Sequence, residues 1–221
     1  MAKKIGVLLS GCGVFDGSEI HEAVLTLLAL DRVEAEAVCM APDTDQMHVV
    51  NHLTNQEAVE EKRNILEESA RIARGEIKNL KDVSAEDIDG LIIPGGFGAA
   101  KNLSNFAVKG ADAQVHPEVE RIINEAVAAE KPVGAICIAP ATLTKILSSK
   151  KPEVTIGNDA GTASAIEEMG GIHKICTVDM IHVDVKNKIV TTPAYMLGPG
   201  IKDVAEGIEK LVRQVVDMAD L

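Results

Sequence analysis

Cys137 lies at the junction of an apolar segment and a helical one, where a thiol can act as a nucleophile. Residues 132–136 are rich in β-forming types and predict a buried strand, whereas residues 139–147 predict a helix. The small residues Ala135 and Ala139 suit a sharp turn around a nucleophile, and the helix N-terminus would favour a thiolate. On spacing alone, a structural cysteine that ends a core strand explains the pattern equally well.

Two carboxylates near the N-terminus share one face of a predicted helix. Glu19 and Glu22 lie three residues apart in its first turn, after the candidate caps Asp16 and Ser18. Either carboxylate alone could simply complement the helix dipole. The Glu22 side chain leans back over the strand ends, so we expect Glu22 rather than Glu19 to serve the Cys137 thiol. Near that thiol and away from water, the pKa of Glu22 should rise.

Glycines follow a second apolar segment, at residues 90–94, which also predicts a buried strand. Gly95 and Gly96 would expose backbone N–H groups at the carboxyl edge of a sheet, where an oxyanion hole can form. A plain turn is the alternative. Phe97 and Asn102 come next as candidate site-lining residues, and Asn102 opens a polar stretch that we expect to be a loop over the site.

The other cysteines and histidines predict no metal site. The chain has four cysteines, none in C-x2-C spacing, which disfavours a zinc knuckle or a thioredoxin motif. Cys12 follows the first predicted strand and could line the same site as Cys137. His48 and His52 have a spacing that could hold a metal on a helix, but no third ligand is evident. We expect neither a metal nor another cofactor.

Composition limits the class of protein and its partners. The 221 residues carry a formal net charge of −12, which disfavours nucleic acids and anionic membranes as partners. No apolar run approaches the roughly 18 residues of a membrane span. The N-terminal residues run directly into a predicted strand, so we expect a cytoplasmic protein with reduced thiols.

Strand-like and helical segments alternate along the whole sequence. This alternation predicts a mostly parallel, doubly wound α/β sheet with helices on both faces, in one domain spanning 1–221. Ligands of such folds bind beyond the carboxyl ends of the strands, where the strand order reverses. The predicted strands are 4–10, 35–40, 76–80, 90–94, 132–136, 154–156, 173–176, 181–185 and 188–192, and the later helices are 57–74, 117–130, 139–147, 162–169 and 201–218.

Together these motifs resemble the ThiJ/PfpI superfamily, which has the flavodoxin-like fold of class I glutamine amidotransferases. The matching pieces are the Glu22 helix, the Pro94-Gly95-Gly96 turn and the segment around Cys137, and they span most of the chain except an apparent insertion at about 43–80. Further stretches, such as Ser10-Gly-Cys-Gly-Val and Thr191-Thr-Pro-Ala-Tyr-Met, resemble the ElbB subfamily. That subfamily is also called sigma cross-reacting protein 27A and is linked by name to isoprenoid biosynthesis.

The resemblance implies a role for each matching residue. Cys137 would be the nucleophile, Glu22 the acid hydrogen-bonded to its sulfur, and the N–H groups of Gly96 and Ile138 the oxyanion hole. Relatives include glutathione-independent glyoxalases and the Parkinsonism-associated deglycase, which are typically homodimers, so the resemblance implies that this protein is also a homodimer.

The sequence departs from the hydrolytic branches of this superfamily. Ile138 stands where the peptidases have histidine after the cysteine, and Thr192-Pro-Ala-Tyr195 replaces the late His-x-Glu of the glutaminases. A neutral thiol needs a base or a lowered pKa, so proteolysis and glutamine hydrolysis are disfavoured. We expect a cofactor-free glyoxalase that converts methylglyoxal or glyoxal to a 2-hydroxy acid through a Cys137 hemithioacetal, with Glu22 moving the proton. The alternatives are a non-catalytic redox or electrophile sensor with Cys12 as resolving thiol, or an accessory protein in isoprenoid biosynthesis.

Overall fold

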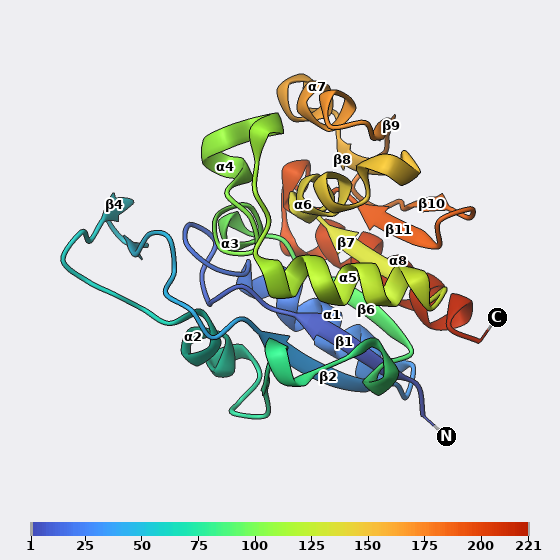
Figure 1. Cartoon of the computed structure of the whole chain (residues 1–221), viewed down its shortest axis with the longest axis horizontal. Coiled ribbons are helices and arrows are strands. Elements are labelled where there is room, and N and C mark those ends of the chain that lie inside the picture. Colours follow the sequence, from blue (N-terminus) through green and yellow to red (C-terminus); the bar gives the residue numbers. More distant parts are fainter. Residues whose placement is uncertain (1, 221) are drawn as a thin grey trace.

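The computed structural model describes residues 2–220, and its centre is a seven-stranded sheet with the order β10-β11-β7-β6-β1-β2-β5 (Figure 1). Every pair in this sheet is parallel except β10 with β11. The mostly parallel, doubly wound fold is therefore confirmed. The strands are β1 Lys4–Leu8, β2 Glu36–Ala41, β5 Lys78–Asn79, β6 Gly90–Ile93, β7 Val133–Ile136, β10 His182–Asp184 and β11 Ile189–Thr192.

Helices cover both faces of this sheet because its central strands are apolar on both sides. Leu91 and Ile93 of β6 join the core under one helical layer, whereas Ile92 joins the core under the other. The two layers are visible in Figure 1 on either side of the sheet, with α5 and α6 opposite α1 and α8. The α-helices are α1 Ile20–Arg32, α2 Ile65–Ile72, α3 Phe97–Lys101, α4 Phe106–Lys109, α5 Pro117–Ala128, α6 Ala139–Ile146, α7 Ala160–Glu168 and α8 Ile201–Met218.

Two small sheets complete the strand inventory. The strands β3 Val50–Asn51 and β4 Gln56–Glu57 form an antiparallel hairpin, and β8 Glu153–Gly157 pairs in parallel with β9 Ile172–Ile175. Short 3₁₀ turns lie at Leu80–Asp82, Ala85–Asp87, Gly110–Asp112, Ser148–Lys150 and Ala194–Met196. Within residues 2–220, no helix combines the length and the apolar character that a membrane crossing needs.

Two predicted segments differ from the structure. The helix predicted over 57–74 is α2 alone, because Asn64 caps it and accepts the N–H groups of Leu66 and Glu67. Before this cap, Glu57 belongs to β4, and residues 58–63 are in no helix or strand. The polar stretch 102–113 is not a loop, since it contains α4 and a 3₁₀ turn. The proposed insertion at about 43–80 thus holds the hairpin, α2 and β5.

The core-facing side of α1 combines small residues with Leu30, which is 1% exposed. Ala23 and Ala29 are buried, whereas Ile20, Val24 and Leu28 are 40–47% exposed. Ala23, Ala29 and Leu30 share one core cluster with residues of α8, so this face of α1 packs against α8. The homodimer stays a prediction.

The sheet reverses its strand order beside β1, and this reversal positions the candidate site. From β1 the chain goes to β2 on one side and later to β6 and β7 on the other. The segments after β1, β6 and β7 therefore meet at one carboxyl edge of the sheet. Such a switch point is where ligands bind in open α/β folds.

Candidate functional site

Cys137 lies between β7 and α6 in a left-handed conformation, with a φ of 62°. Its N–H donates to the carbonyl oxygen of Thr192 at 3.0 Å, and the residue is 8% exposed. A non-glycine residue with a positive φ on a strand-to-helix turn is typical of a nucleophile elbow, where the turn presents the side chain above the sheet.

Two backbone donors point at the sulfur of Cys137. The N–H groups of Gly96 and Ile138 both hydrogen-bond to it and lower the pKa of the thiol. Gly96 has a φ of 94°, and a Cβ there would lie 2.3 Å from the backbone nitrogen of Glu19. Only glycine therefore fits this position, which brings a free N–H close to the thiol.

Glu22 approaches the same sulfur from α1. Its carboxyl group is fully buried and hydrogen-bonds the Cys137 thiol. The Gly95 N–H donates to Oε2 at 2.9 Å, and the Tyr195 N–H donates to Oε1 at 3.2 Å. A Cβ on Gly95 would lie 2.5 Å from the Cβ of Cys137 and 2.6 Å from Glu22 Oε2, so Gly95 has to be glycine for this pair to form.

Glu19 has a different task from Glu22. It is the N-cap of α1, and its Oε2 accepts the N–H of Glu22 at 2.7 Å. The predicted caps Asp16 and Ser18 lie before this position. Glu19 also lines the pocket above Cys137, where its charge acts on Glu22.

The electrostatics of the pair favour the protonated forms. Burial, followed by the charge of Glu19, raises the pKa of Glu22 to about 8, in the direction expected from the sequence. Burial and the charge of Glu22 also raise the pKa of Cys137 well above its ordinary value. The expectation of a lowered thiol pKa was wrong, because these two effects outweigh the N–H donors at the helix N-terminus.

A pocket of about 480 Å³ opens above the Cys137 thiol. Its walls are mostly apolar and come from the loop after β1, α3, α4 and the segment after β11. The charged side chains that line it are Glu19 and Asp159, both acidic. The lining includes the predicted residues Glu19, Gly96, Phe97, Cys137 and Ile138, whereas Gly95 lies behind the thiol.

Asn102 and Cys12 were predicted to line the site, but they lie outside this pocket. The Asn102 amide is buried and donates to the carbonyl oxygens of Ser10 and Asp16, each at 2.8 Å, so it supports the loop after β1 from below. Cys12 is on that loop, and burial, followed by the charge of Glu68, raises the pKa of its thiol. Strand ends alone could not show which way each side chain turns.

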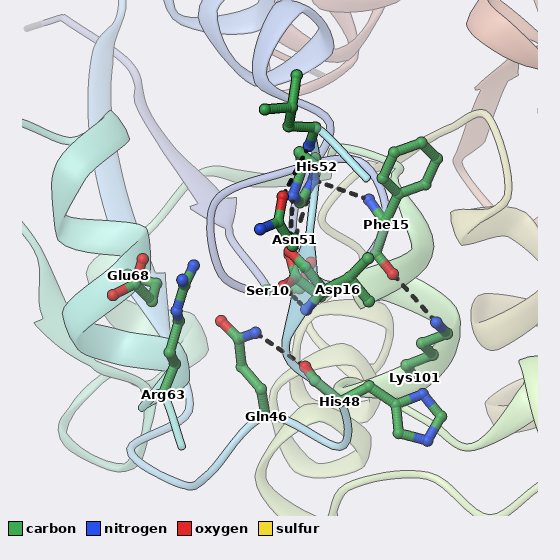
Figure 2. Close-up of polar contacts among 12 residues, drawn as sticks. Ser10, Phe15, Asp16, Gln46, His48, Asn51, His52, Arg63, Glu68 and Lys101 are labelled. Carbon is green, nitrogen blue, oxygen red and sulfur yellow. Dashed lines mark hydrogen bonds and ion pairs between the residues drawn. The ribbon is translucent and has the colours of Figure 1, made fainter. Parts of the chain in front are cut away.

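His48 and His52 form no metal site. His48 lies in an irregular segment before β3 and His52 in the turn after it, and the two imidazoles do not face each other (Figure 2). In the part of the chain that the structure describes, no group of three metal-ligating side chains occurs. The four-residue spacing suggested a shared face only on the assumption of a helix.

His52 and Asp16 instead attach the β3–β4 hairpin to the loop after β1 (Figure 2). His52 Nε2 accepts the N–H of Phe15 at 3.2 Å, and Asp16 Oδ2 accepts the N–H of Val50 at 2.7 Å. The other oxygen of Asp16 is buried without a hydrogen-bond partner among residues 2–220, and it lies 3.9 Å from His52 Nε2.

Two titratable residues at or beside the pocket, Tyr195 and His21, were not predicted from the sequence as site residues. Tyr195 lines the pocket, and its hydroxyl lies 2.7 Å from Nδ1 of His21. The signal available was that Tyr195, the only tyrosine, lies just beyond the end of the predicted strand 188–192. The sequence offered no reason to select His21, because its contact with Tyr195 is between residues 174 positions apart.

Curated relatives match this chain over almost its whole length. The ES1 protein homolog, mitochondrial, of Rattus norvegicus is 47% identical over 97% of this chain and 84% of its own length. Human glutamine amidotransferase-like class 1 domain-containing protein 3, mitochondrial, is 48% identical over 98% of this chain and 84% of its own. Membership of the ElbB subfamily and the cytoplasmic location stay predictions.

A solved structure superposes closely on nearly the whole chain. The crystal structure of an isoprenoid biosynthesis protein with an amidotransferase-like domain from Ehrlichia chaffeensis has a TM-score of 0.90 and 40% identity, and the match covers 97% of this chain and 99% of that one. The profile of the DJ-1/PfpI family matches residues 12–191, which include Glu22, Gly96 and Cys137. This chain therefore belongs to the DJ-1/PfpI family.

Proposed function

We propose that this protein is a cofactor-free enzyme that converts small dicarbonyl compounds, such as methylglyoxal and glyoxal, into 2-hydroxy acids. The observation that carries the proposal is the buried hydrogen bond between Glu22 and Cys137, below an apolar pocket. It joins a nucleophile to a carboxyl group whose pKa of about 8 suits proton transfer near neutral pH. The proton acceptor in contact with the sulfur is a carboxyl group rather than an imidazole.

The first step would be addition of Cys137 to the aldehyde carbon. Glu22 in its ionised form takes the thiol proton as the C–S bond forms, and the aldehyde oxygen takes up that proton to give a hemithioacetal. The N–H groups of Gly96 and Ile138 already point at the sulfur. An oxygen on the carbon bonded to that sulfur comes within their reach, which would stabilise its developing charge.

The second step would be isomerisation within the adduct. The proton on the former aldehyde carbon moves to the neighbouring carbon through Glu22, so the first carbon is oxidised and the second is reduced. The product of this step is a thioester of Cys137. Water then attacks the thioester carbon, the C–S bond breaks, and the thiol recovers a proton while the 2-hydroxy acid leaves.

The pocket supports a small neutral substrate better than a large anionic one. Its mostly apolar lining provides few polar contacts for a specific large ligand. The acidic groups Glu19 and Asp159 would repel a diphosphate, which argues against a prenyl diphosphate as ligand. The same charges would favour release of the carboxylate product.

A redox sensor is less well supported. Burial and Glu22 raise the pKa of Cys137, whereas sensor thiols depend on a lowered pKa. Cys12 is not among the residues that line the Cys137 pocket, so it is poorly placed as a resolving thiol. Mass spectrometry after mild peroxide treatment would support the sensor if Cys137 oxidised faster than Cys39 and Cys176.

The test of the enzyme is an assay for lactate from methylglyoxal without glutathione. We expect turnover by the native protein, its loss in Cys137→Ala, and its retention in Cys176→Ala, which removes a thiol outside the pocket. Equal rates for the native protein and Cys137→Ala would overturn the proposal. Ammonia release from glutamine that required Cys137 would instead favour an amidotransferase.

A further inference from the structure

Tyr195 and His21 form a pair that connects the Cys137 pocket with solvent. The Tyr195 hydroxyl lies 2.7 Å from His21 Nδ1, and the two ring centroids are 5.8 Å apart. Tyr195 lines the pocket together with Cys137, whereas His21 is exposed on the first turn of α1. A phenol and an imidazole in hydrogen-bond contact can exchange a proton between them.

This pair also adjoins Glu22 on two sides. His21 precedes Glu22 in α1, and the backbone N–H of Tyr195 donates to Glu22 Oε1 at 3.2 Å. Burial, followed by the charges of Glu19 and Glu22, raises the pKa of Tyr195. The hydroxyl therefore keeps its proton at neutral pH and is available as a donor.

The proposed reaction needs a second proton-transfer group besides Glu22. While Glu22 holds the proton taken from carbon, negative charge develops on the neighbouring ketone oxygen. In an apolar pocket that also contains Glu19 and Asp159, this charge is costly unless a donor meets it. Among the pocket-lining side chains, the Tyr195 hydroxyl is a neutral donor of this kind.

We propose that Tyr195 is a catalytic acid–base residue of this reaction, acting on the substrate oxygens, and that His21 is its positioning residue. The inference rests on the proposed dicarbonyl activity. For the isomerisation step it assigns the carbon proton to Glu22 and the oxygen protons to Tyr195. His21 orients the hydroxyl and donates from Nδ1 when the phenolate forms.

The proton transfers balance without an outside reactant. In the hemithioacetal, Glu22 removes the proton from the first carbon, and Tyr195 gives its proton to the ketone oxygen, which produces an enediol. Glu22 then returns its proton to the second carbon, and the phenolate of Tyr195 takes the hydroxyl proton from the first carbon's oxygen. The result is the thioester, with both protein groups restored to their starting protonation states.

The kinetic test compares Tyr195→Phe, His21→Gln and His48→Gln with the native protein. Tyr195→Phe keeps the backbone N–H that holds Glu22 and removes only the hydroxyl, so we expect kcat to fall by about 100-fold with KM nearly unchanged. His21→Gln keeps a polar partner for the hydroxyl, and we expect a fall of about 10-fold, as fits a positioning role. His48→Gln, which removes an imidazole outside the pocket, should retain native rates.

A spectroscopic test does not depend on turnover. The chain contains one tyrosine and no tryptophan, so its near-ultraviolet tyrosine absorption reports on Tyr195 alone. Hydroxyacetone carries the ketone without the aldehyde and serves as the probe. We expect it to shift the Tyr195 absorption saturably in the native protein and in Cys137→Ala.

The two tests separate the failure of this inference from that of the proposed function. Native turnover that persists in Tyr195→Phe overturns the role of Tyr195 and leaves the dicarbonyl activity standing. A hydroxyacetone response without any dicarbonyl turnover overturns the proposed function, and with it the catalytic role, but supports a carbonyl contact at Tyr195. Loss of kcat in Tyr195→Phe together with the absorption response supports the inference as stated.

Discussion

The fully buried carboxyl group of Glu22 hydrogen-bonds the Cys137 thiol, and Gly95 fills the space beside both groups. The three residues come from the segments after β1, β6 and β7, so this contact exists only when the switch point of the sheet has formed. Because the two titratable groups share one dry environment, each shifts the pKa of the other.

Replacement of Glu22 should remove activity far more than replacement of Glu19. Glu22→Gln takes away the group that accepts the thiol proton, so we expect dicarbonyl turnover to fall by at least about 100-fold. Glu19→Gln keeps a cap acceptor for the Glu22 N–H and should cost less than about 10-fold. Kinetics with a melting curve for each variant check this, and near-native turnover of Glu22→Gln would refute the assignment.

The rate should depend on the ionisation of Glu22. Below pH 8 the carboxyl group is mostly protonated and cannot accept the thiol proton, since its pKa is about 8. We therefore expect kcat/KM for methylglyoxal to rise with pH and to level off above about pH 8. A profile that is flat between pH 6 and about pH 9 would contradict Glu22 as the base.

The free energy of unfolding should decrease as the pH rises through the range in which Glu22 is ionised in the unfolded chain but still protonated in the folded one. The folded pKa of about 8 exceeds the ordinary value of 4.5, so the folded state binds more protons between these values. The free energy of unfolding should decrease across this window by up to about 1.4 kcal/mol per pH unit, relative to Glu22→Gln. Urea unfolding of both proteins at pH 5 and 8 measures the difference, and parallel pH dependences would argue against a raised pKa.

Gly95→Ala should disrupt the Glu22–Cys137 contact. The added Cβ would lie 2.5 Å from the Cβ of Cys137 and 2.6 Å from Glu22 Oε2, so we expect a loss of stability of about 1–3 kcal/mol and of most turnover. Gly161→Ala is the matched control, because its nearest neighbour would be 3.6 Å away and the position is within α7. That control should raise stability by about 0.5–1 kcal/mol and leave the rate unchanged.

Asp16→Ala should loosen the β3–β4 hairpin. It leaves the N–H of Val50 without its acceptor, so we expect faster hydrogen exchange and proteolysis at residues 47–52 and a stability loss of about 1–3 kcal/mol. Asp45→Ala removes an acid that is exposed and 3.6 Å from Lys62 and should have almost no effect. Unchanged exchange at Val50 in Asp16→Ala would show that other contacts hold the hairpin.

Local pattern in the sequence determined the strands and helices that build the site. The apolar segment before Cys137, the small residues around it and the glycines after β6 each have a local physical reason, because strand burial and turn geometry act over a few residues. The alternation of strands and helices likewise determined the doubly wound class of the fold.

Tertiary structure alone decided which side chains meet and in which protonation state. Glu22 contacts the Cys137 thiol, whereas Cys12 lies outside the pocket and Asn102 is buried beneath the loop after β1. The pKa of Cys137 rose because burial and a neighbouring acid outweighed the helix N-terminus that the local pattern suggested. Tyr195 met His21 across 174 residues of chain. Side-chain direction and desolvation depend on what packs around a residue, and that is set by contacts between segments far apart in the sequence.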